Sequence, residues 1–365
     1  MSGSRITRRE FVRDTSVAAA ALAAGASAAK AAEADKSKIL NYNENMEYRR
    51  WGRTGLMVSA VCLGGHWKRI NEVVPDLFKG GNWLAVDPTN ADFLKNRTEV
   101  VSRCIDIGIN YIDACTHKET LAYSHALKGR RDKMHLGYSW YEHELRNGQF
   151  RTAPALLKSL EDGMKACGLD YVDLWRITMH EQSHNHTDAE VEQMMKALET
   201  AKKQGKARFA GFSSHDRLHI KKMIETYPTI VDSIVTPYTA KTKAAPTDSL
   251  FETLKTHDVG MFGIKPFASG SLFKGGGTPK GPDADEDDKR ARLAIRYILC
   301  NPVLTAPIPG MIAPTQVDNV ALAIKERKEN KELSRADLDH LQAAMGEAWA
   351  ALPADYQWLK DWEHV

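Results

Sequence analysis

Histidine and carboxylate side chains recur in this chain where short apolar runs end, and these are the residue types best suited to chemistry. Five histidines follow five successive runs: His66, His117, His143, His180 and His215. Four carboxylates lie close to them in sequence: Asp113, Glu119, Glu142 and Glu181. Imidazole and carboxylate groups bind zinc, manganese or iron, so one interpretation is a divalent metal site whose candidate ligands are His66, His117, His180 and His215. The alternative is that these histidines solvate loops or hydrogen-bond a substrate.

Two lysines extend this set. Lys118 follows His117, and the two form a candidate acid/base pair, because a lysine beside Asp113 could donate a proton or hold an anionic intermediate. A structural ion pair between Lys118 and Asp113 is the alternative. Lys265 ends a later apolar run, where it either faces the same site or only packs before Pro266.

These residues can act together only if the runs that carry them end at one place. Apolar runs at 59–64, 110–113, 134–139, 171–177, 207–213, 231–236, 259–265 and 304–308 alternate with helical patterns such as those at 153–167, 188–204 and 216–226. This alternation predicts an α/β fold, a single closed (β/α)8 TIM barrel whose strands share one mouth at their carboxyl ends. An open doubly wound sheet is the alternative, which the absence of GxGxxG after the first run disfavours.

Two long segments and the C-terminal tail are predicted to lie at that mouth. Residues 67–96 are far longer than an ordinary strand-to-helix loop, which indicates a lid lined by Trp67 and Trp83. A loop that only packs on the barrel surface is the alternative. Residues 273–290 combine glycines at 275–277 with an acidic run at 283–288 that suits a helix start. The barrel is predicted to span 36–330, and residues 331–365 to form a helix and tail packed on it.

The first residues predict export. Residues 7–13 read TRREFVR, a twin-arginine pattern, and an alanine-rich run and small-residue cleavage sites follow. Residues 1–35 are therefore predicted to be a twin-arginine signal peptide, and the mature chain to be periplasmic or otherwise extracytoplasmic. No later apolar stretch approaches the roughly 20 residues of a membrane span. The net charge is +3, without a basic block for nucleic acid, and the five cysteines lack metal or redox spacing.

Seven motifs, in order along residues 46–330, make the chain similar to the aldo-keto reductases. They are RRWGRTGLMVSAVCLGG, GINYIDA, ALKGRRDK, GLDYVDLW, KQGKARFAGFSSHD, GMFGIKPFASGSLF and IPGMIAPTQVDN. The resemblance implies a (β/α)8 barrel with an N-terminal β-hairpin and long loops at the C-terminal face. It also implies an oxidoreductase that uses a nicotinamide dinucleotide on a carbonyl compound or polyol, such as a sugar.

In that family an Asp, a Tyr, a Lys and a His perform catalysis, and the resemblance places only the first of them here. Asp113 matches the Asp, whereas the Tyr position falls at His117 or Lys118 and the Lys position at Ser139. The His position falls at Thr178, with His180 two residues on. The resemblance thus implies a non-standard mechanism, whose catalytic candidates are Asp113, His117, Lys118, Thr178 and His180.

The same resemblance implies a site for NADP or NAD. Ser213 corresponds to the serine that binds the nicotinamide amide, Ser214 replaces the usual asparagine, and Ile264, before Lys265, replaces an aromatic residue under the nicotinamide. The loop and helix start that hold the adenosine phosphate half are matched by Gly310, Met311, Gln316 and Asp318. No basic residue for a 2′-phosphate stands at 313–315, so the choice between NADP and NAD stays open.

Three functions are consistent with these residues. The first is an exported oxidoreductase of the aldo-keto reductase type. The second is a redox-neutral or metal-dependent isomerase, epimerase or lyase acting on a sugar, and the third is a non-catalytic binding barrel. In each case the partner is a small molecule, and the sequence carries no signal for the oligomeric state.

Overall fold

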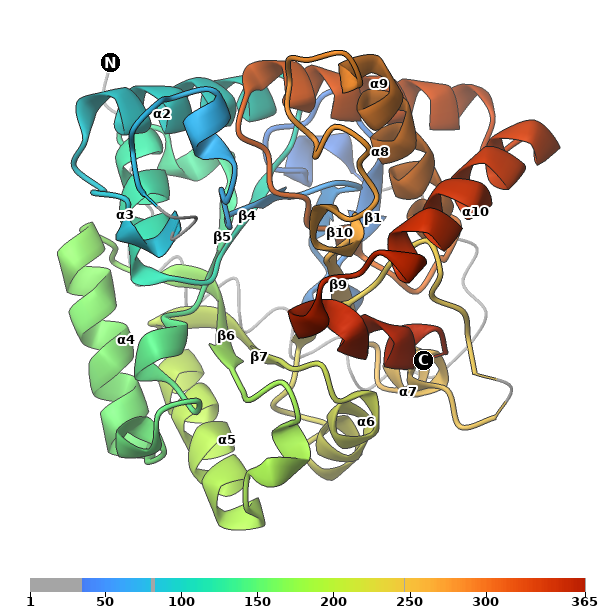
Figure 1. Cartoon of the computed structure of the whole chain (residues 1–365). Helices are drawn as coiled ribbons and strands as arrows, with labels where there is room; N and C mark the ends of the chain where they lie inside the picture. Colours follow the sequence, from blue (N-terminus) through green and yellow to red (C-terminus); the bar gives the residue numbers. More distant parts are fainter. Residues whose placement is uncertain (1–34, 80–82, 246, 365) are drawn as a thin grey trace.

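Eight parallel strands form a closed barrel in the computed structural model, which describes residues 35–79, 83–245 and 247–364. The strands are β3 (Leu63–Gly64), β4 (Tyr111–Ala114), β5 (His135–Tyr138), β6 (Val172–Thr178), β7 (Ala207–Ser213), β8 (Ser233–Pro237), β9 (Gly260–Ile264) and β10 (Ala306–Pro307). Each pairs with the next in chain order. The barrel closes between β3 and β10, where the N–H groups of Cys62 and Gly64 donate to the carbonyls of Pro307 and Pro309 (Figure 1). The predicted fold is confirmed.

Helices surround this barrel (Figure 1). They are α2 (Ala91–Asp106), α3 (His117–Ala126), α4 (Ala153–Cys167), α5 (Asp188–Lys203), α6 (Arg217–Thr226), α7 (Leu250–Thr256), α8 (Ala284–Leu299), α9 (Pro314–Glu329) and α10 (Arg335–Ala350). Several of these helices begin where a side chain accepts a hydrogen bond from a backbone N–H group of the first turn, as Asp216 does before α6 and Ser334 before α10. Asp283 stands at the cap position of α8, and Asp285, Glu286 and Asp287 lie in its first turn, as expected from the helix dipole.

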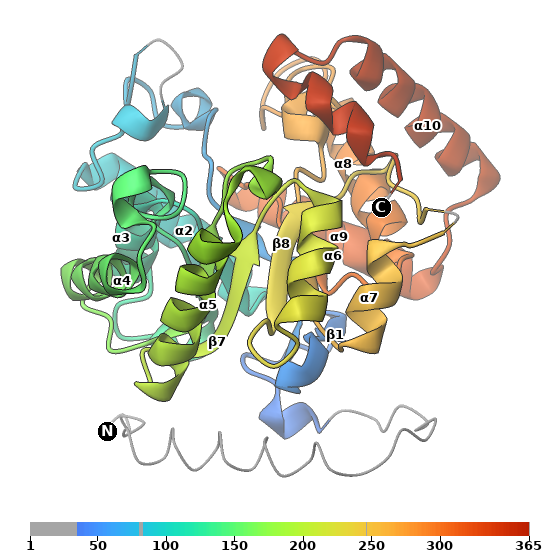
Figure 2. The same cartoon turned by 90° about the horizontal axis from the view of Figure 1, so that it is seen from below.

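The N-terminal hairpin pairs β1 (Tyr48–Arg50) with β2 (Met57–Ser59). The run predicted as one strand at 59–64 is therefore divided, because Ser59 belongs to the hairpin while Leu63 pairs with Ile112 of the barrel. Figure 2 shows the hairpin at one end of the barrel, with the segment before α2 and the C-terminal segment at the opposite end.

An aromatic cluster fills the hairpin end of the barrel. Trp51 is fully buried, and its ring lies 5.3–5.4 Å from the rings of Tyr111, Phe209 and Phe262. Its indole N–H donates to the Ser233 hydroxyl at 3.0 Å. A Cβ at Gly260 would lie 2.3 Å from Trp51, so this position accepts only glycine. The interior is thus packed at this end, and space remains only at the other.

In the segment predicted as a lid, Trp67 packs into the core and Trp83 lines the mouth of the barrel. Trp67 is buried and packs edge-on against Phe93 and Tyr123, so its predicted lining role is wrong. Trp83 does line the pocket at the mouth. The last six residues of the predicted lid, 91–96, are already helical, since α2 begins at Ala91.

The C-terminal tail returns to the mouth. After α10 the chain forms the 3-10 helix η11 (Ala354–Trp362), drawn in red beside β9 in Figure 1. The Trp358 ring stacks on His215 with ring centroids 4.1 Å apart, and Lys243 forms a parallel bridge with His364.

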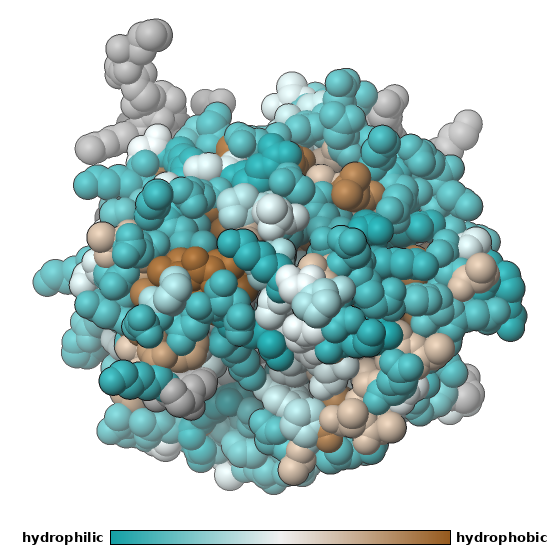
Figure 3. All heavy atoms as spheres, turned by 45° about the horizontal axis from the view of Figure 1, so that its top comes forward, coloured by the Kyte–Doolittle hydropathy of each residue, from teal (hydrophilic) through white to brown (hydrophobic). Residues whose placement is uncertain are grey.

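Across the described ranges, no helix has the length and apolar character needed to cross a bilayer. The face in Figure 3 is mostly hydrophilic, with apolar side chains confined to small areas. The predicted signal peptide lies outside the described residues, Asp35 excepted.

Candidate active site

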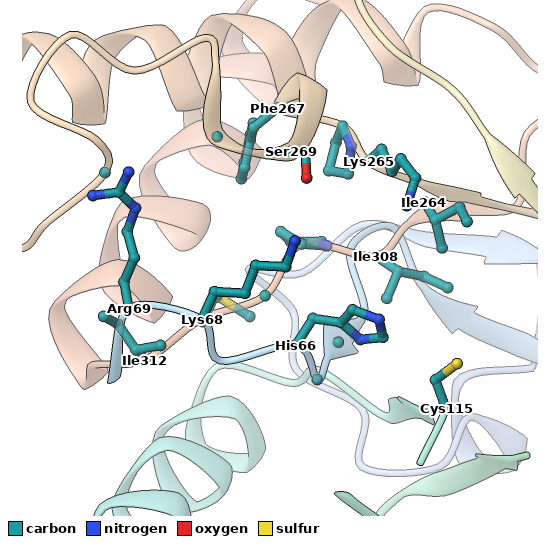
Figure 4. A pocket seen from close by; sticks show the side chains of 18 of the residues that line it. His66, Lys68, Arg69, Cys115, Ile264, Lys265, Phe267, Ser269, Ile308 and Ile312 are labelled. Carbon is teal, nitrogen blue, oxygen red and sulfur yellow. The ribbon is translucent and has the colours of Figure 1, made fainter. Parts of the chain in front are cut away.

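A cavity of about 970 Å³ occupies the mouth of the barrel. Its walls come from strand ends and from the segments that follow β3, β9 and β10, together with η11. Figure 4 shows His66, Lys68 and Arg69 along one side, facing Ile264, Lys265 and Ser269 on the other. Residues far apart in sequence therefore share one site, as the barrel prediction requires.

An ion pair between Asp113 and Arg176 forms the floor of this cavity. Arg176 Nε and Nη2 donate to the two Asp113 carboxylate oxygens at 2.8 and 2.5 Å, and the two side chains are 5% and 2% exposed. Burial opposes the charged guanidinium, but Asp113 outweighs it and holds the pKa of Arg176 well above its ordinary value. A permanent, oriented positive charge is thus fixed at the base of the pocket.

Hydroxyl groups surround this charge. Arg176 Nη1 donates to Thr178 Oγ1 at 3.1 Å and to Ser213 Oγ at 3.4 Å. Ser139 Oγ lies 2.8 Å from Thr178 Oγ1 and donates to Glu144 Oε2 at 2.6 Å. Burial raises the pKa of Glu144, although hydrogen bonds from Ser139 and from backbone N–H groups oppose this. Ser139 and Thr178, the residues predicted to stand at the family's Lys and His positions, are therefore adjacent, and both carry hydroxyl groups.

The expected cofactor residues divide into two groups. Ser213, Lys265, Gly310, Met311 and Gln316 line the cavity. Gln316 Oε1 accepts the Ile312 N–H, and its Nε2 donates to the carbonyl of Gly277. These bonds connect the loop before α9 to the glycine-rich segment, so Gln316 shapes the cavity wall.

Ser214 and Asp318 lie outside the cavity, and their predicted contact with a cofactor is wrong. Ser214 Oγ bonds the Ser183 hydroxyl at 2.7 Å, because the next residue on a strand points to the opposite side. Asp318 points outward from α9 and pairs with Arg103 of α2.

His117 and Lys118 also lie outside the cavity. Thr116 caps α3 in a capping box with Glu119, so both residues belong to the first helical turn. The His117 ring stacks on Trp140 at 4.2 Å, and Lys118 Nζ donates to the carbonyls of Leu84 and Val86. The predicted acid/base pair beside Asp113 is therefore wrong, and so is the ion-pair alternative.

The four candidate metal ligands do not converge. His66 lines the cavity, but its Nδ1 pairs with Glu119 at 3.0 Å, and His215 stacks on Trp358. His180 lies outside the lining, and its backbone N–H donates to the ring of His186. Among the described residues no group of three or more His, Cys, Asp or Glu side chains could hold a metal ion. The structure therefore contradicts the metal-site interpretation for this part of the chain.

Sequence reasoning missed several residues that shape the site. Arg97 is fully buried, and it donates through Nη1 to the Met311 carbonyl at 2.8 Å and through Nη2 to that of Ile312 at 3.0 Å. Arg176 had one available signal, since it lies two residues before Thr178 and so faces the same side of its strand. Lys68 and Tyr356 carry no such periodic signal, because Lys68 lies in a turn and Tyr356 in a short 3-10 helix.

Comparison with known proteins agrees with this architecture. The model of the aldo/keto reductase family matches residues 79–338. L-galactose dehydrogenase of Arabidopsis thaliana is 24% identical over 82% of this chain and 94% of its own length. L-glyceraldehyde 3-phosphate reductase of Escherichia coli is 26% identical over 62% of this chain and 63% of its own.

Solved structures show the same fold. An aldo-keto reductase of Bacillus halodurans, in its holo form, covers 86% of this chain and 99% of its own, with 20% identity and a TM-score of 0.57. One from Klebsiella pneumoniae, in complex with NADPH, covers 82% and 94%, with 17% identity and a TM-score of 0.60. The motifs, the closed barrel and the match over residues 79–338 agree, and the chain belongs to the aldo/keto reductase family.

Proposed function

We propose that this chain is an NADP(H)-dependent oxidoreductase that interconverts a carbonyl group and an alcohol on a sugar or related polyol. The observation that carries the proposal is the single cavity, which joins Ser213 and Ile264 at the strand ends to the loop of Gly310, Met311 and Gln316. These are the two places where the family holds the halves of a dinucleotide. The names of the relatives, a dehydrogenase of L-galactose and a reductase of L-glyceraldehyde 3-phosphate, support the substrate class.

The residues of the cavity fit a dinucleotide. Arg69 supplies positive charge to the cavity wall for a phosphate group, and the buried Ser213 hydroxyl faces the part of the cavity assigned to the nicotinamide amide. Helix α9 starts at Pro314, and its cap residue Ala313 makes no side-chain hydrogen bond. N–H groups at this helix start therefore remain for a phosphate. When bound, the cofactor supplies or accepts a hydride at its nicotinamide ring.

The chain's own contribution is electrostatic. In the reduction a carbonyl oxygen gains negative charge, and fixed hydrogen-bond donors near that oxygen stabilise the transition state. Arg176 supports such donors, since Asp113 occupies its Nε and Nη2 while its Nη1 donates to the hydroxyl groups of Thr178 and Ser213 at the cavity floor. We assign to Arg176 and Thr178 the orientation of the substrate oxygen, in place of the family's histidine.

Titration of the purified protein with NADPH tests the proposal. Quenching of protein fluorescence should give a saturable dissociation constant, and NADH should be compared in parallel. Ser213→Ala and Gln316→Ala should each weaken binding, whereas Ser214→Ala, a change in the adjacent residue outside the cavity, should leave it unchanged. Absence of binding to either nucleotide would overturn the proposal. Oxidation of NADPH with DL-glyceraldehyde, followed at 340 nm, then tests the carbonyl chemistry.

We also propose that the protein is exported by the twin-arginine route. The support is the sequence pattern at residues 7–13 alone. Replacing Arg8 and Arg9 by lysine should retain the full-length chain in the cytoplasm, as measured by cell fractionation. Unchanged export of this double variant would contradict the proposed route.

A further inference from the structure

Three segments of the chain meet around one tyrosine side chain in the cavity. Lys68 lies after β3, Lys265 follows β9, and Tyr356 lies in η11. Lys68 Nζ donates to Tyr356 Oη at 2.6 Å. Lys265 Nζ lies 5.7 Å from the centre of the Tyr356 ring. Figure 4 shows Lys68 reaching across the pocket toward Ser269, whose hydroxyl also bonds Tyr356.

Both ammonium groups lack a carboxylate partner within ion-pair distance among the described residues. Two like charges placed around one phenol favour its anion. Burial alone would raise the pKa of Tyr356, but hydrogen bonds from Lys68 and Ser269 and the charge of Lys265 outweigh it and lower this pKa from 10.0. Tyr141, the other tyrosine in the described cavity lining, has its pKa raised by burial and by Glu142.

Tyr356 lines the same cavity as Ser213 and Ile264, the residues of the proposed nicotinamide site. Lys265 directly follows Ile264, the position under the nicotinamide in the family. Trp358, two residues after Tyr356, stacks on His215, two residues after Ser213. Lys265, which lies over the rings of Tyr356 and Trp358, and Trp358, which stacks on His215, thus connect Tyr356 to the strand ends that carry Ile264 and Ser213.

The backbone near this cluster is strained. Lys265, Ala268 and Ser269 have φ values of 57°, 48° and 58°, a left-handed region that residues other than glycine rarely adopt. Such strain persists where the surrounding structure imposes it, commonly at functional sites. A simple contact between the lid and the tail would not require it.

We propose that Tyr356, held between Lys68 and Lys265, exchanges the proton with the substrate oxygen. The assignment rests on the proposed oxidoreductase function. In the reduction, the carbonyl carbon gains the hydride that NADPH supplies and forms a C–H bond. The carbonyl π electrons move to the oxygen, which takes the Tyr356 proton, and NADP⁺ and a tyrosinate remain. The tyrosinate regains a proton from water, and in the oxidation it accepts the alcohol proton.

Substitution of Tyr356 tests this role with NADPH and DL-glyceraldehyde. Tyr356→Phe should lower kcat by about 100-fold or more, the usual contribution of a general acid, and leave the NADPH dissociation constant within twofold. Tyr141→Phe should lose at least tenfold less, and Tyr227→Phe, outside the cavity, should behave as wild type. Retention of kcat by Tyr356→Phe, or a larger loss in Tyr141→Phe, would overturn the assignment.

Substitutions of Lys68 separate proton transfer from a merely structural contact. Lys68→Met should move the basic limb of the pH–rate profile to higher pH, and Lys68→Arg should restore it. A structural contact would change the amplitude and not the position of that limb. An unmoved limb in Lys68→Met contradicts the proposal.

A spectroscopic titration decides the matter even if the chosen aldehyde is not reduced. Tyrosinate absorbance near 295 nm should reveal one tyrosine that ionises below the others, and Tyr356→Phe should abolish this phase. Absence of the phase from the wild type overturns the inference, whatever the activity. Failure of NADPH to bind, with the phase present, would instead count against the proposed function alone.

Discussion

The two sides of the barrel mouth differ in how closely they keep the family pattern. At the ends of β4, β5 and β6, Asp113 pairs with Arg176, and the positions predicted from the resemblance to correspond to the Lys and the His carry Ser139 and Thr178. At β7, β9 and the start of α9, Ser213, Gly310, Met311 and Gln316 line the cavity as the family pattern implies. The match to the family pattern is therefore closer at β7, β9 and α9 than at β4, β5 and β6.

The largest expected effect at the ends of β4 and β6 follows from removing the charge of Arg176. Arg176→Met leaves Asp113 buried without a partner, and loss of one member of a buried ion pair costs about 3–5 kcal/mol. Urea denaturation should show this loss. The double variant Asp113→Asn, Arg176→Met should recover most of it, because no buried charge remains. A loss under about 1 kcal/mol in the single variant would contradict this view of the pair.

At the loop before α9, on the side of the proposed cofactor site, the corresponding test is Arg97→Met. The variant removes the Arg97 donor to the Met311 carbonyl, at about 1–3 kcal/mol for a buried unsatisfied group, whereas the Ile312 carbonyl keeps the Asn96 amide as a donor. The loop should loosen, and NADPH binding should weaken by about tenfold, equivalent to about 1.4 kcal/mol. Arg103→Met serves as control, since Arg103 is also on α2 but pairs outside the cavity with Asp318. Equal nucleotide affinity in the two variants would contradict a role of Arg97 in the loop.

Between the two sides, Glu119 connects the segment after β3 to α3. Its fully buried carboxylate accepts N–H groups of His66, Cys115 and Thr116 and pairs with the His66 ring. Burial raises the pKa of Glu119, but His66 and the N–H donors outweigh it, so the folded pKa lies below 4.5. The stabilisation is therefore present above the unfolded pKa and is lost as pH falls through the folded value.

Glu119→Gln should thus lower stability by about 2 kcal/mol at pH 7, the size expected for hydrogen bonds to a charged group. The difference from wild type should shrink below about pH 4. Thermal unfolding at pH 7 and pH 3.5 measures both. A difference that stays constant with pH would show that the charge of Glu119 does not stabilise the fold.

The fold was predictable because hydrophobic period and caps are local signals. The predicted helix at 153–167 and strand at 207–213 match α4 and β7 residue for residue. The site was less predictable, because side-chain direction depends on where a helix begins or on strand parity. The capping box at Thr116 turns Lys118 away from Asp113, and alternation along β7 turns Ser214 away from Ser213. Arg176 and Tyr356 act through partners more than 60 residues away in sequence, which no local pattern encodes.

The smallest expected effect concerns Lys118, whose amine donates to the carbonyls of Leu84 and Val86 at 2.7 and 2.9 Å. Because the Lys118 side chain is only half-buried, Lys118→Ala should cost about 1 kcal/mol, within the range for hydrogen bonds of this kind. NADPH affinity should not change, and kcat should stay within about twofold, a barrier change of about 0.4 kcal/mol. Parallel urea denaturation and nucleotide titration measure these effects. A loss of kcat comparable to that of Tyr356→Phe would contradict this expectation. It would mean that proton transfer requires the segment around Leu84 and Val86, which Lys118 holds in place.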